Sequence, residues 1–147
     1  MTDIGTFSLA SALVEKFEGC RLAAYRDCAE VWTIGWGHTG PEVHAGLVWS
    51  QQQCDETLER DLALADETVG ELWPGQVFSP WQRAALISLV YNFGSKLQDS
   101  QLQLFVKEGN WAAAARQWIR WDHTAGKETR GLLRRRLVEA AMFVEGS

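Results

Sequence analysis

Three polar side chains near the start of the chain, on Glu18, Asp27 and Thr33, have the types that proton-transfer chemistry needs. Glu18 ends a predicted helix, where the negative end of the helix dipole and apolar neighbours disfavour the ionised carboxylate, so the group could keep a proton to donate. Asp27 falls in a wetter turn and suits a carboxylate, and the Thr33 hydroxyl can hold a water molecule. Considered alone, the three are more typical of ordinary roles as a last-turn residue, a turn former and a strand residue.

The elements that position these residues follow from the spacing of apolar and turn-forming residues. Apolar side chains recur every four positions in residues 8–18 and a glycine follows, which predicts a helix that ends at Glu18. Short β-like stretches between glycines predict a small, turn-rich sheet in residues 21–40. A capping box at Ser50 and Gln53 begins a predicted long helix that a Pro-Gly pair ends.

The second half of the chain is predicted to be helical. Ser79-Pro80-Trp81-Gln82 combines an N-cap, a first-turn proline and a capping glutamine, so a helix should run from there towards Gly94. Further helices are predicted over residues 100–108, from residue 110 and near the C-terminus, with the polar stretch 123–130 as a loop.

Together these elements predict an α+β, mainly helical architecture in a single catalytic domain, residues 1–147. We expect an N-terminal lobe with a small sheet (about 1–50), a connecting helix (about 50–73) and a helical C-terminal lobe (about 74–147), which would leave a cleft for a polymer substrate between the lobes. A length of 147 residues, 46% of them hydrophobic and 22% charged, is typical of one soluble globular domain.

Three ordered motifs resemble those of the phage-type lysozymes, glycoside hydrolase family 24. Glu18 is followed by Asp27 nine residues later and by Thr33 after six more, which is the spacing of the family's catalytic signature. Tyr91-Asn92-Phe93-Gly94 is similar to its aromatic-Asn-x-Gly segment. Gly131-Leu132 with Arg135-Arg136 and Glu139 is similar to its C-terminal motif, and Trp118 to Trp121 and Gly126-Lys127 also fit.

The resemblance implies a two-lobed lysozyme fold and a muramidase, an endolysin that hydrolyses the β-1,4 bond between N-acetylmuramic acid and N-acetylglucosamine in bacterial peptidoglycan and lyses the host cell. Glu18 would be the general acid, and Asp27 and Thr33 would stabilise charge and position water. Since the family inverts the anomeric centre, that water would be the nucleophile. No cofactor is expected.

Candidate substrate-binding residues are Tyr25, Trp36, His38, Asn92 and Arg135. His38 also fits a structural histidine bonded to a neighbouring helix or acid, and either Arg135 or Arg136 could form an ion pair near the catalytic acid, as the resemblance implies. One departure lies in the turn between Asp27 and Thr33, where family members usually carry glycine and this chain has Glu30. Because glutamate adopts positive φ less readily than glycine, a longer or reshaped turn is predicted.

The net charge and the cysteine content limit the kinds of partner that the chain is expected to bind. The net charge is −5, yet seven of the fourteen basic residues lie between Arg116 and Arg136, a patch that suits an anionic polymer such as a cell wall or a nucleic acid, or else a solvated helix face. Three cysteines cannot all pair, so reduced thiols are expected, although a disulfide between Cys20 and Cys28 could distort the catalytic segment. No zinc-type spacing of Cys and His occurs, and we expect no metal and no nucleic-acid partner.

The N-terminus has no signal-peptide pattern, and no apolar run reaches transmembrane length. We therefore expect a monomer without a membrane anchor, held in the host cytoplasm until a separately encoded holin permeabilises the membrane, and then active on the periplasmic wall. Two other functions stay open. A lytic transglycosylase would cut the same bond with the acid alone, and a non-catalytic cell-wall-binding module would use the basic patch and exposed Trp faces.

Overall fold

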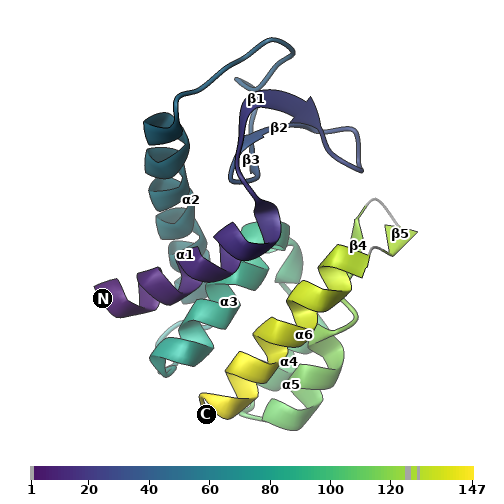
Figure 1. The fold of residues 1–147 in the computed structure, drawn as a ribbon. Helices are drawn as coiled ribbons and strands as arrows, with labels where there is room; N and C mark the ends of the chain where they lie inside the picture. Colours follow the sequence, from purple (N-terminus) through teal and green to yellow (C-terminus); the bar gives the residue numbers. More distant parts are fainter. Residues whose placement is uncertain (1, 125–126, 129) are drawn as a thin grey trace.

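The computed structural model describes residues 2–124, 127–128 and 130–147. Within them the chain forms six α-helices and a small antiparallel sheet, so the predicted α+β, mainly helical fold is confirmed (Figure 1). The helices are α1 (Ile4–Glu18), α2 (Gln51–Leu72), α3 (Pro80–Phe93), α4 (Gln101–Lys107), α5 (Trp111–Trp118) and α6 (Arg130–Glu145), with a 3₁₀ turn η1 (Gly94–Leu97). The strands are β1 (Arg21–Arg26), β2 (Trp32–Gly35), β3 (His38–Thr39), β4 (His123–Thr124) and β5 (Lys127–Glu128).

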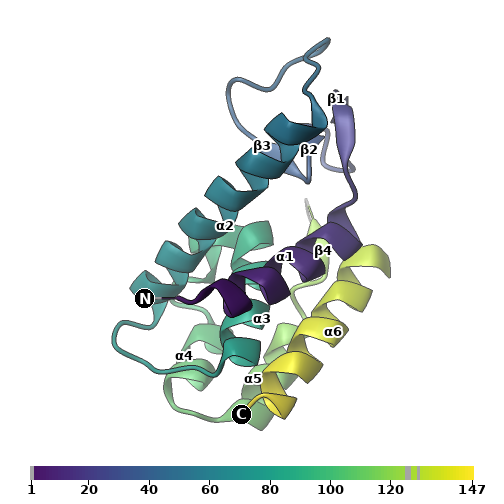
Figure 2. The same cartoon turned by 60° about the vertical axis from the view of Figure 1, so that its left-hand side comes forward.

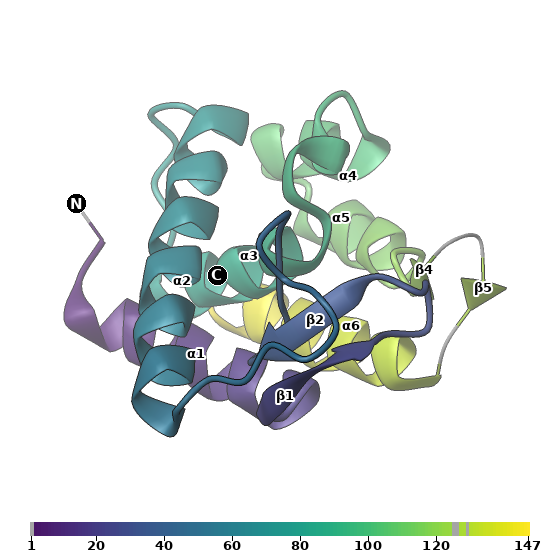
Figure 3. The same ribbon diagram turned by 90° about the horizontal axis from the view of Figure 1, so that it is seen from above.

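Strands β1, β2 and β3 form the predicted sheet in the order β1-β2-β3. Thr33 in the middle strand pairs with Tyr25 on one side and with Thr39 on the other. Figure 1 shows this sheet at one end of the molecule, with α2 running from it along the helical part, as the turned view repeats (Figure 2). Seen from the sheet's end, α2 and the β4–β5 pair lie on opposite sides of the molecule (Figure 3).

Local capping signals begin the two helices that carry most of the packing. Both capping boxes are present, with Ser50 and Gln53 exchanging bonds at the start of α2 and Ser79 and Gln82 doing so at the start of α3. The predicted long helix is confirmed as the 22 residues of α2. Each box satisfies backbone N–H groups that would otherwise have no partner in the first turn.

Helix α3 is the centre of the core. Its residues 84–90 are all buried, because α1, α2 and α6 pack around it. On its α6 side, Phe143 contacts Trp118 and Trp111 with ring centroids 5.0 Å apart in each pair. Burial on every side explains why α3 shows no polar face in its sequence. The same packing makes α3 a rigid support for the residues at its C-terminal end.

Two predicted boundaries were wrong. Helix α1 begins at Ile4 rather than at residue 8, because the Asp3 side chain caps it by accepting a hydrogen bond from the Thr6 backbone N–H at 2.7 Å. The predicted loop 123–130 instead contains paired strands, His123 opposite Glu128 and Thr124 opposite Lys127. Residues 125, 126 and 129, including the Gly126 of the family motif, lie outside the described residues.

Candidate active site

Glu18 lies at the last position of α1, where Gly19 ends the helix with a positive φ of 67°. Its side chain is 20% exposed, and its Oε1 accepts a hydrogen bond from Arg135 Nη1 of α6 at 2.8 Å. The predicted ion pair near the acid is therefore formed by Arg135 and not by Arg136. With Oε1 held by the guanidinium, Oε2 is the oxygen left to exchange a proton with a ligand.

Asp27 directs a tight turn between β1 and β2. Its Oδ1 accepts hydrogen bonds from the backbone N–H groups of Ala29 and Val31, at 2.8 and 2.9 Å, and its own N–H donates to the Val31 carbonyl at 3.0 Å. Two of these bonds hold the carboxylate to the turn, and the third closes the turn through the backbone. The same turn holds the exposed Glu30 at a φ of 62°, in the left-handed region where glycine would fit best, so Glu30 adopts the positive φ rather than avoiding it.

We expect Glu30→Gly to raise the free energy of unfolding by about 0.5–1 kcal/mol. Relief of the left-handed conformation contributes about 1–2 kcal/mol, and the extra freedom of glycine in the unfolded chain offsets part of it. Urea denaturation of both proteins measures the difference. Glu30→Ala, which removes the carboxylate but keeps Cβ, is the control and should bring no gain; equal stabilities for wild type and Glu30→Gly would contradict the strain argument.

Thr33 is 3% exposed and lies at the centre of the sheet. Its hydroxyl donates to the Val31 carbonyl at 2.9 Å, which leaves the hydroxyl oxygen as an acceptor. The bond also orients Oγ1, because Val31 belongs to the turn that Asp27 directs. Thr33 can therefore accept a hydrogen bond from a water molecule while its own proton is engaged elsewhere.

A pocket of about 270 Å³ brings the three predicted catalytic residues together. Tyr25 and Asn92, two of the predicted substrate-binding residues, also line it. The remaining lining residues are Cys28, Gly37, Thr39, Tyr91 and Leu132. The pocket thus joins the end of α1, the sheet and the end of α3, as the predicted constellation requires.

A buried ionic network holds Arg135, the residue that pairs with Glu18. Arg135 is 1% exposed and its Nε donates to Ser88 Oγ and to Glu139 Oε2, both at 3.2 Å, while Nη2 donates to the Ser88 carbonyl at 3.1 Å. Glu139, fully buried, also accepts hydrogen bonds from the Ser88 hydroxyl and from Trp118 Nε1. Arg136 Nε lies 2.7 Å from Glu139 Oε1. Glu139 therefore balances two guanidinium groups and holds Arg135 in the position that reaches Glu18.

Two residues on the α3 side complete the pocket. Asn92 Oδ1 accepts a hydrogen bond from Arg136 Nη2 at 2.8 Å, so the buried network also orients this side chain. The Tyr91 hydroxyl donates to the Trp36 carbonyl at 2.7 Å, and burial, together with the negative charges of Asp61 and Glu18, raises its pKa. Ser88, Tyr91 and Glu139 were not among the predicted site residues. Tyr91 and Glu139 stood in the matched motifs, whereas no sequence signal marked Ser88.

Trp36 and His38 do not line this pocket. Trp36 Nε1 donates to Asp55 on α2 at 2.9 Å, and His38 lies between Asp61 and Glu42, each 2.6 Å from one ring nitrogen. Both side chains hold the β2–β3 turn against α2, and His38 also bonds to Glu42 in the neighbouring loop. His38 therefore has the structural role that the sequence left open for it. The bond to Asp61, with smaller contributions from Glu42, raises the pKa of His38 from 6.5 to about 9, although burial opposes the shift.

We expect His38→Asn to destabilise the protein at pH 6 but much less at pH 9.5. Because the folded pKa lies above the unfolded value of 6.5, the stabilisation is fully present below pH 6.5 and is lost as the pH rises through about 9. The expected loss at pH 6 is about 1–2 kcal/mol, because solvent screening of this partly exposed group reduces the stability that the pKa shift alone would give. Urea denaturation at both values measures it, with the exposed His44→Asn as control. The same loss at both pH values would rule out an ionic role.

The structure divides the basic patch. Arg135 and Arg136 are buried in ion pairs, whereas Arg116, Arg120 and Arg134 are exposed. The side chains of Lys127 and Arg130 lie outside the described residues. Only part of the patch is thus available to an anionic polymer.

The cysteines are free in this structure. Cys20 contacts the Gln51 amide, with Nε2 3.6 Å from its sulfur, and Cys28 is exposed at the pocket. Burial and a hydrogen bond with the Cys20 thiol raise the pKa of Cys54 to about 11. Cys20 therefore lies beside Cys54 rather than bonded to Cys28. Among the described side chains, no group of three or more His, Cys, Asp or Glu residues has an arrangement that could hold a metal ion.

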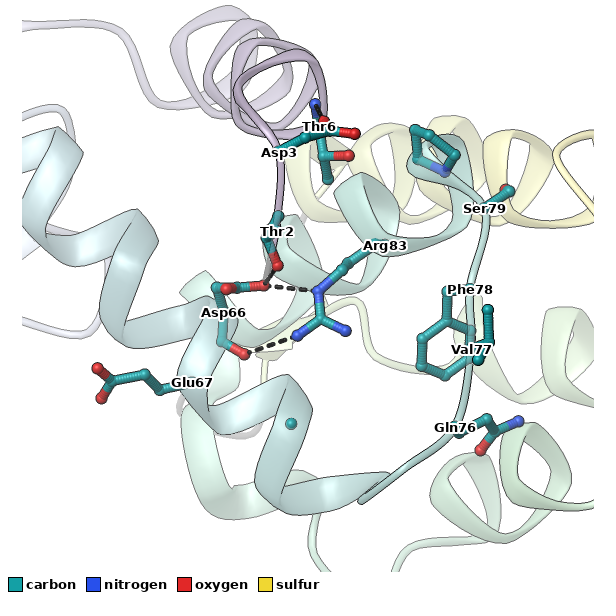
Figure 4. Close-up of a pocket in the computed structure, with 12 residues that line it drawn as sticks. Thr2, Asp3, Thr6, Asp66, Glu67, Gln76, Val77, Phe78, Ser79 and Arg83 are labelled. Carbon is teal, nitrogen blue, oxygen red and sulfur yellow. Dashed lines mark hydrogen bonds and ion pairs between the residues drawn. The ribbon is translucent and has the colours of Figure 1, made fainter.

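A second polar pocket, of about 450 Å³, lies where the beginnings of α1 and α3 meet α2 (Figure 4). Arg83 and Asp66 form an ion pair across it, with 2.6 Å between Nε and Oδ1, and Thr2 donates to the same carboxylate oxygen. None of the predicted site residues lines this pocket.

The described helices include none that is both long and apolar enough to span a bilayer.

A carboxyl at a helix end, an aspartate in a β-turn and a threonine on the adjoining strand lie together against a helical body, which is the arrangement that the sequence predicted for a lysozyme-type glycoside hydrolase. A model of the phage lysozyme family matches residues 15–139. The chain belongs to the phage lysozyme family, as the sequence motifs predicted.

Individual relatives agree with this assignment. The endolysin of Bacillus phage B103 is 34% identical over 137 residues, which cover 91% of this chain and 52% of that protein, so the chain spans about half of its length. The SAR-endolysin of Enterobacteria phage P21 is 30% identical over 149 residues, covering 97% and 90%.

Solved structures share the fold. The endolysin from Escherichia coli O157:H7 phage FAHEc1 superposes with a TM-score of 0.82 at 25% identity, covering 100% of this chain and 95% of the other. The muramidase domain of SpmX from Asticaccaulis excentricus gives 0.78 at 28% identity, with 92% and 94% covered.

Proposed function

We propose that this chain is an endolysin that hydrolyses the β-1,4 bond between N-acetylmuramic acid and N-acetylglucosamine in bacterial peptidoglycan and so lyses the host cell. The observation that carries the proposal is the shared pocket, which Glu18, Asp27 and Thr33 all line. Family membership and the endolysin relatives support the substrate class. We also propose a single catalytic domain, with lobes at about residues 1–50 and 74–147 joined by the helix at about 50–73.

In the proposed mechanism, Glu18 Oε2 donates its proton to the leaving glycosidic oxygen as the bond from that oxygen to the anomeric carbon breaks. The Asp27 carboxylate stabilises the developing positive charge on the sugar and accepts a proton from water. Thr33 Oγ1 orients that water, whose oxygen bonds to the anomeric carbon. Arg135 then balances the charge left on Glu18, at the 2.8 Å contact. Tyr25 and Asn92 contact the saccharide at the wall of the pocket.

Analysis of the reaction products tests the proposal. Muropeptides released from purified peptidoglycan should carry reducing N-acetylmuramic acid ends, and in ¹⁸O-labelled water they should gain one labelled oxygen. Mass spectrometry resolves both. Products with 1,6-anhydro ends and no label would identify a transglycosylase instead, a reaction in which Asp27 and Thr33 have no water to direct. Absence of any cleavage would contradict both enzymatic functions.

The setting of the reaction is also a proposal. We propose that the chain acts as a monomer, stays in the host cytoplasm until a separately encoded holin opens the membrane, and then reaches the periplasmic wall. Expression of the chain alone should leave host cells intact until the membrane is permeabilised, after which the culture should clear. Clearing with an intact membrane would show a route of export other than a holin.

A further inference from the structure

Gly37 lies against the carboxyl group of Glu18. A Cβ atom built on Gly37 would lie 1.7 Å from Glu18 Oε2, 2.7 Å from Cδ and 3.2 Å from Cγ. The first two separations are far shorter than any van der Waals contact allows, so no residue with a side chain fits at this position while Glu18 keeps its conformation. The contact is made by a residue 19 positions further along the chain, in the turn between β2 and β3.

The Gly37 backbone cannot easily move away, because both neighbouring residues are anchored. The Trp36 carbonyl accepts the Tyr91 hydroxyl at 2.7 Å, and the His38 ring lies 2.6 Å from Asp61 and from Glu42. On the opposite side, Glu18 Oε1 is held by Arg135. The carboxyl group is thus confined between a fixed stretch of backbone and a fixed guanidinium.

We infer that Gly37 is a positioning residue for the catalytic acid: its bare Cα forms the seat that holds the Glu18 carboxyl against Arg135 and directs Oε2 to the pocket. The inference rests on the proposed role of Glu18. It also separates two requirements for glycine at this position. A φ of 88° favours glycine on conformational grounds, and the contact with Glu18 excludes a side chain for a second, independent reason.

The loop residue Gly46 supplies a matched control. Its φ is 87°, nearly that of Gly37, but nothing lies within 4 Å of a Cβ built on it. Gly37→Ala and Gly46→Ala therefore place alanine at nearly the same positive φ, and they differ in the contact with Glu18. An effect found in the first variant and not in the second is due to what the added methyl group meets at Gly37, either the Glu18 carboxyl or a ligand in the pocket that Gly37 lines.

We expect Gly37→Ala to lower kcat on soluble peptidoglycan fragments by about 100-fold, the scale of a displacement of about 1 Å in a catalytic group, with KM changed less than about threefold. Gly46→Ala should keep wild-type activity. In the Glu18→Gln background, where no acid remains to be misplaced, adding Gly37→Ala should cause no further loss. A loss that persists in that background, or that falls on KM, would mean that Gly37 acts only as pocket wall and would overturn the inference.

Thermal unfolding supplies a readout that does not depend on activity. Gly37→Ala should lower Tm by more than Gly46→Ala does, and removing the colliding group with Glu18→Ala should abolish this excess. If Gly37→Ala fails to fold and Glu18→Ala does not restore it, the inference is wrong. The proposed function fails separately: an active Glu18→Gln variant would refute the role of the acid, whereas an inactive Glu18→Gln variant beside a fully active Gly37→Ala variant would refute only the seat.

Discussion

Replacing Glu18 with glutamine is expected to reduce the rate of peptidoglycan cleavage by at least about 10²- to 10⁴-fold, the contribution of general acid catalysis. Glutamine keeps the shape of the side chain and an oxygen that can accept the Arg135 hydrogen bond, but an amide NH2 group replaces Oε2 and has no acidic proton to transfer. A glycosidic oxygen that leaves without a proton is a poor leaving group, so the remaining groups cannot compensate. Turbidity clearing of wall suspensions and product analysis both measure the loss.

The fold of the Glu18→Gln variant should survive. Arg135 keeps its partner Glu139, so the buried guanidinium is not left without a counter-charge, and the loss in stability should be about 1 kcal/mol, the difference between a charged and a neutral hydrogen bond. Glu15→Gln, at an exposed position one turn earlier in α1, makes the same chemical change and should keep full activity. More than about a tenth of the wild-type rate in a folded Glu18→Gln variant, well short of the general-acid range, would contradict the assignment.

Replacing Glu139 with glutamine is expected to cause the largest loss of stability, about 3–5 kcal/mol, because it leaves two buried guanidinium groups without their shared carboxylate. Arg135 and Arg136 are 1% and 0% exposed, so water cannot solvate the uncompensated charge. Activity should also fall, since Arg135 loses the bond that directs it towards Glu18. Urea denaturation measures the first effect and the rate of wall cleavage at low temperature, where the variant remains folded, measures the second.

Glu145→Gln is the matched control, because Glu145 belongs to the same helix α6 and is exposed. It should change the free energy of unfolding by less than about 0.5 kcal/mol, as surface substitutions usually do. If the two variants were equally stable, the buried carboxylate would contribute nothing that glutamine cannot replace, and the network would have to be described as hydrogen bonding without a charge requirement.

Much of the fold was predictable because its signals are local. The capping boxes at Ser50 and Ser79 involve residues three positions apart, and the helix end at Gly19 depends on one glycine, so neither needs knowledge of the rest of the chain. The first turn of α1 was missed because its apolar pattern begins later than its cap. The predicted loop at 123–130 was wrong in part because strands as short as β4 and β5 carry no periodic signal.

The residues of the candidate site likewise fall into two groups, those that local sequence predicted and those that long-range contacts placed. The candidates for the chemistry could be identified from sequence, since Glu18, Asp27 and Thr33 lie within one short segment whose helix, turn and strand are locally encoded. It left open which arginine meets the acid, what holds that arginine, and where Trp36 and His38 point. Those answers depend on contacts such as that between Arg135 and Glu18, 117 residues apart, and that between Ser88 and Glu139, 51 apart. The packing of α1 and α6 against α3, and of the β2–β3 turn against α2, decided them, because burial leaves each of these polar groups dependent on partners that no local pattern specifies.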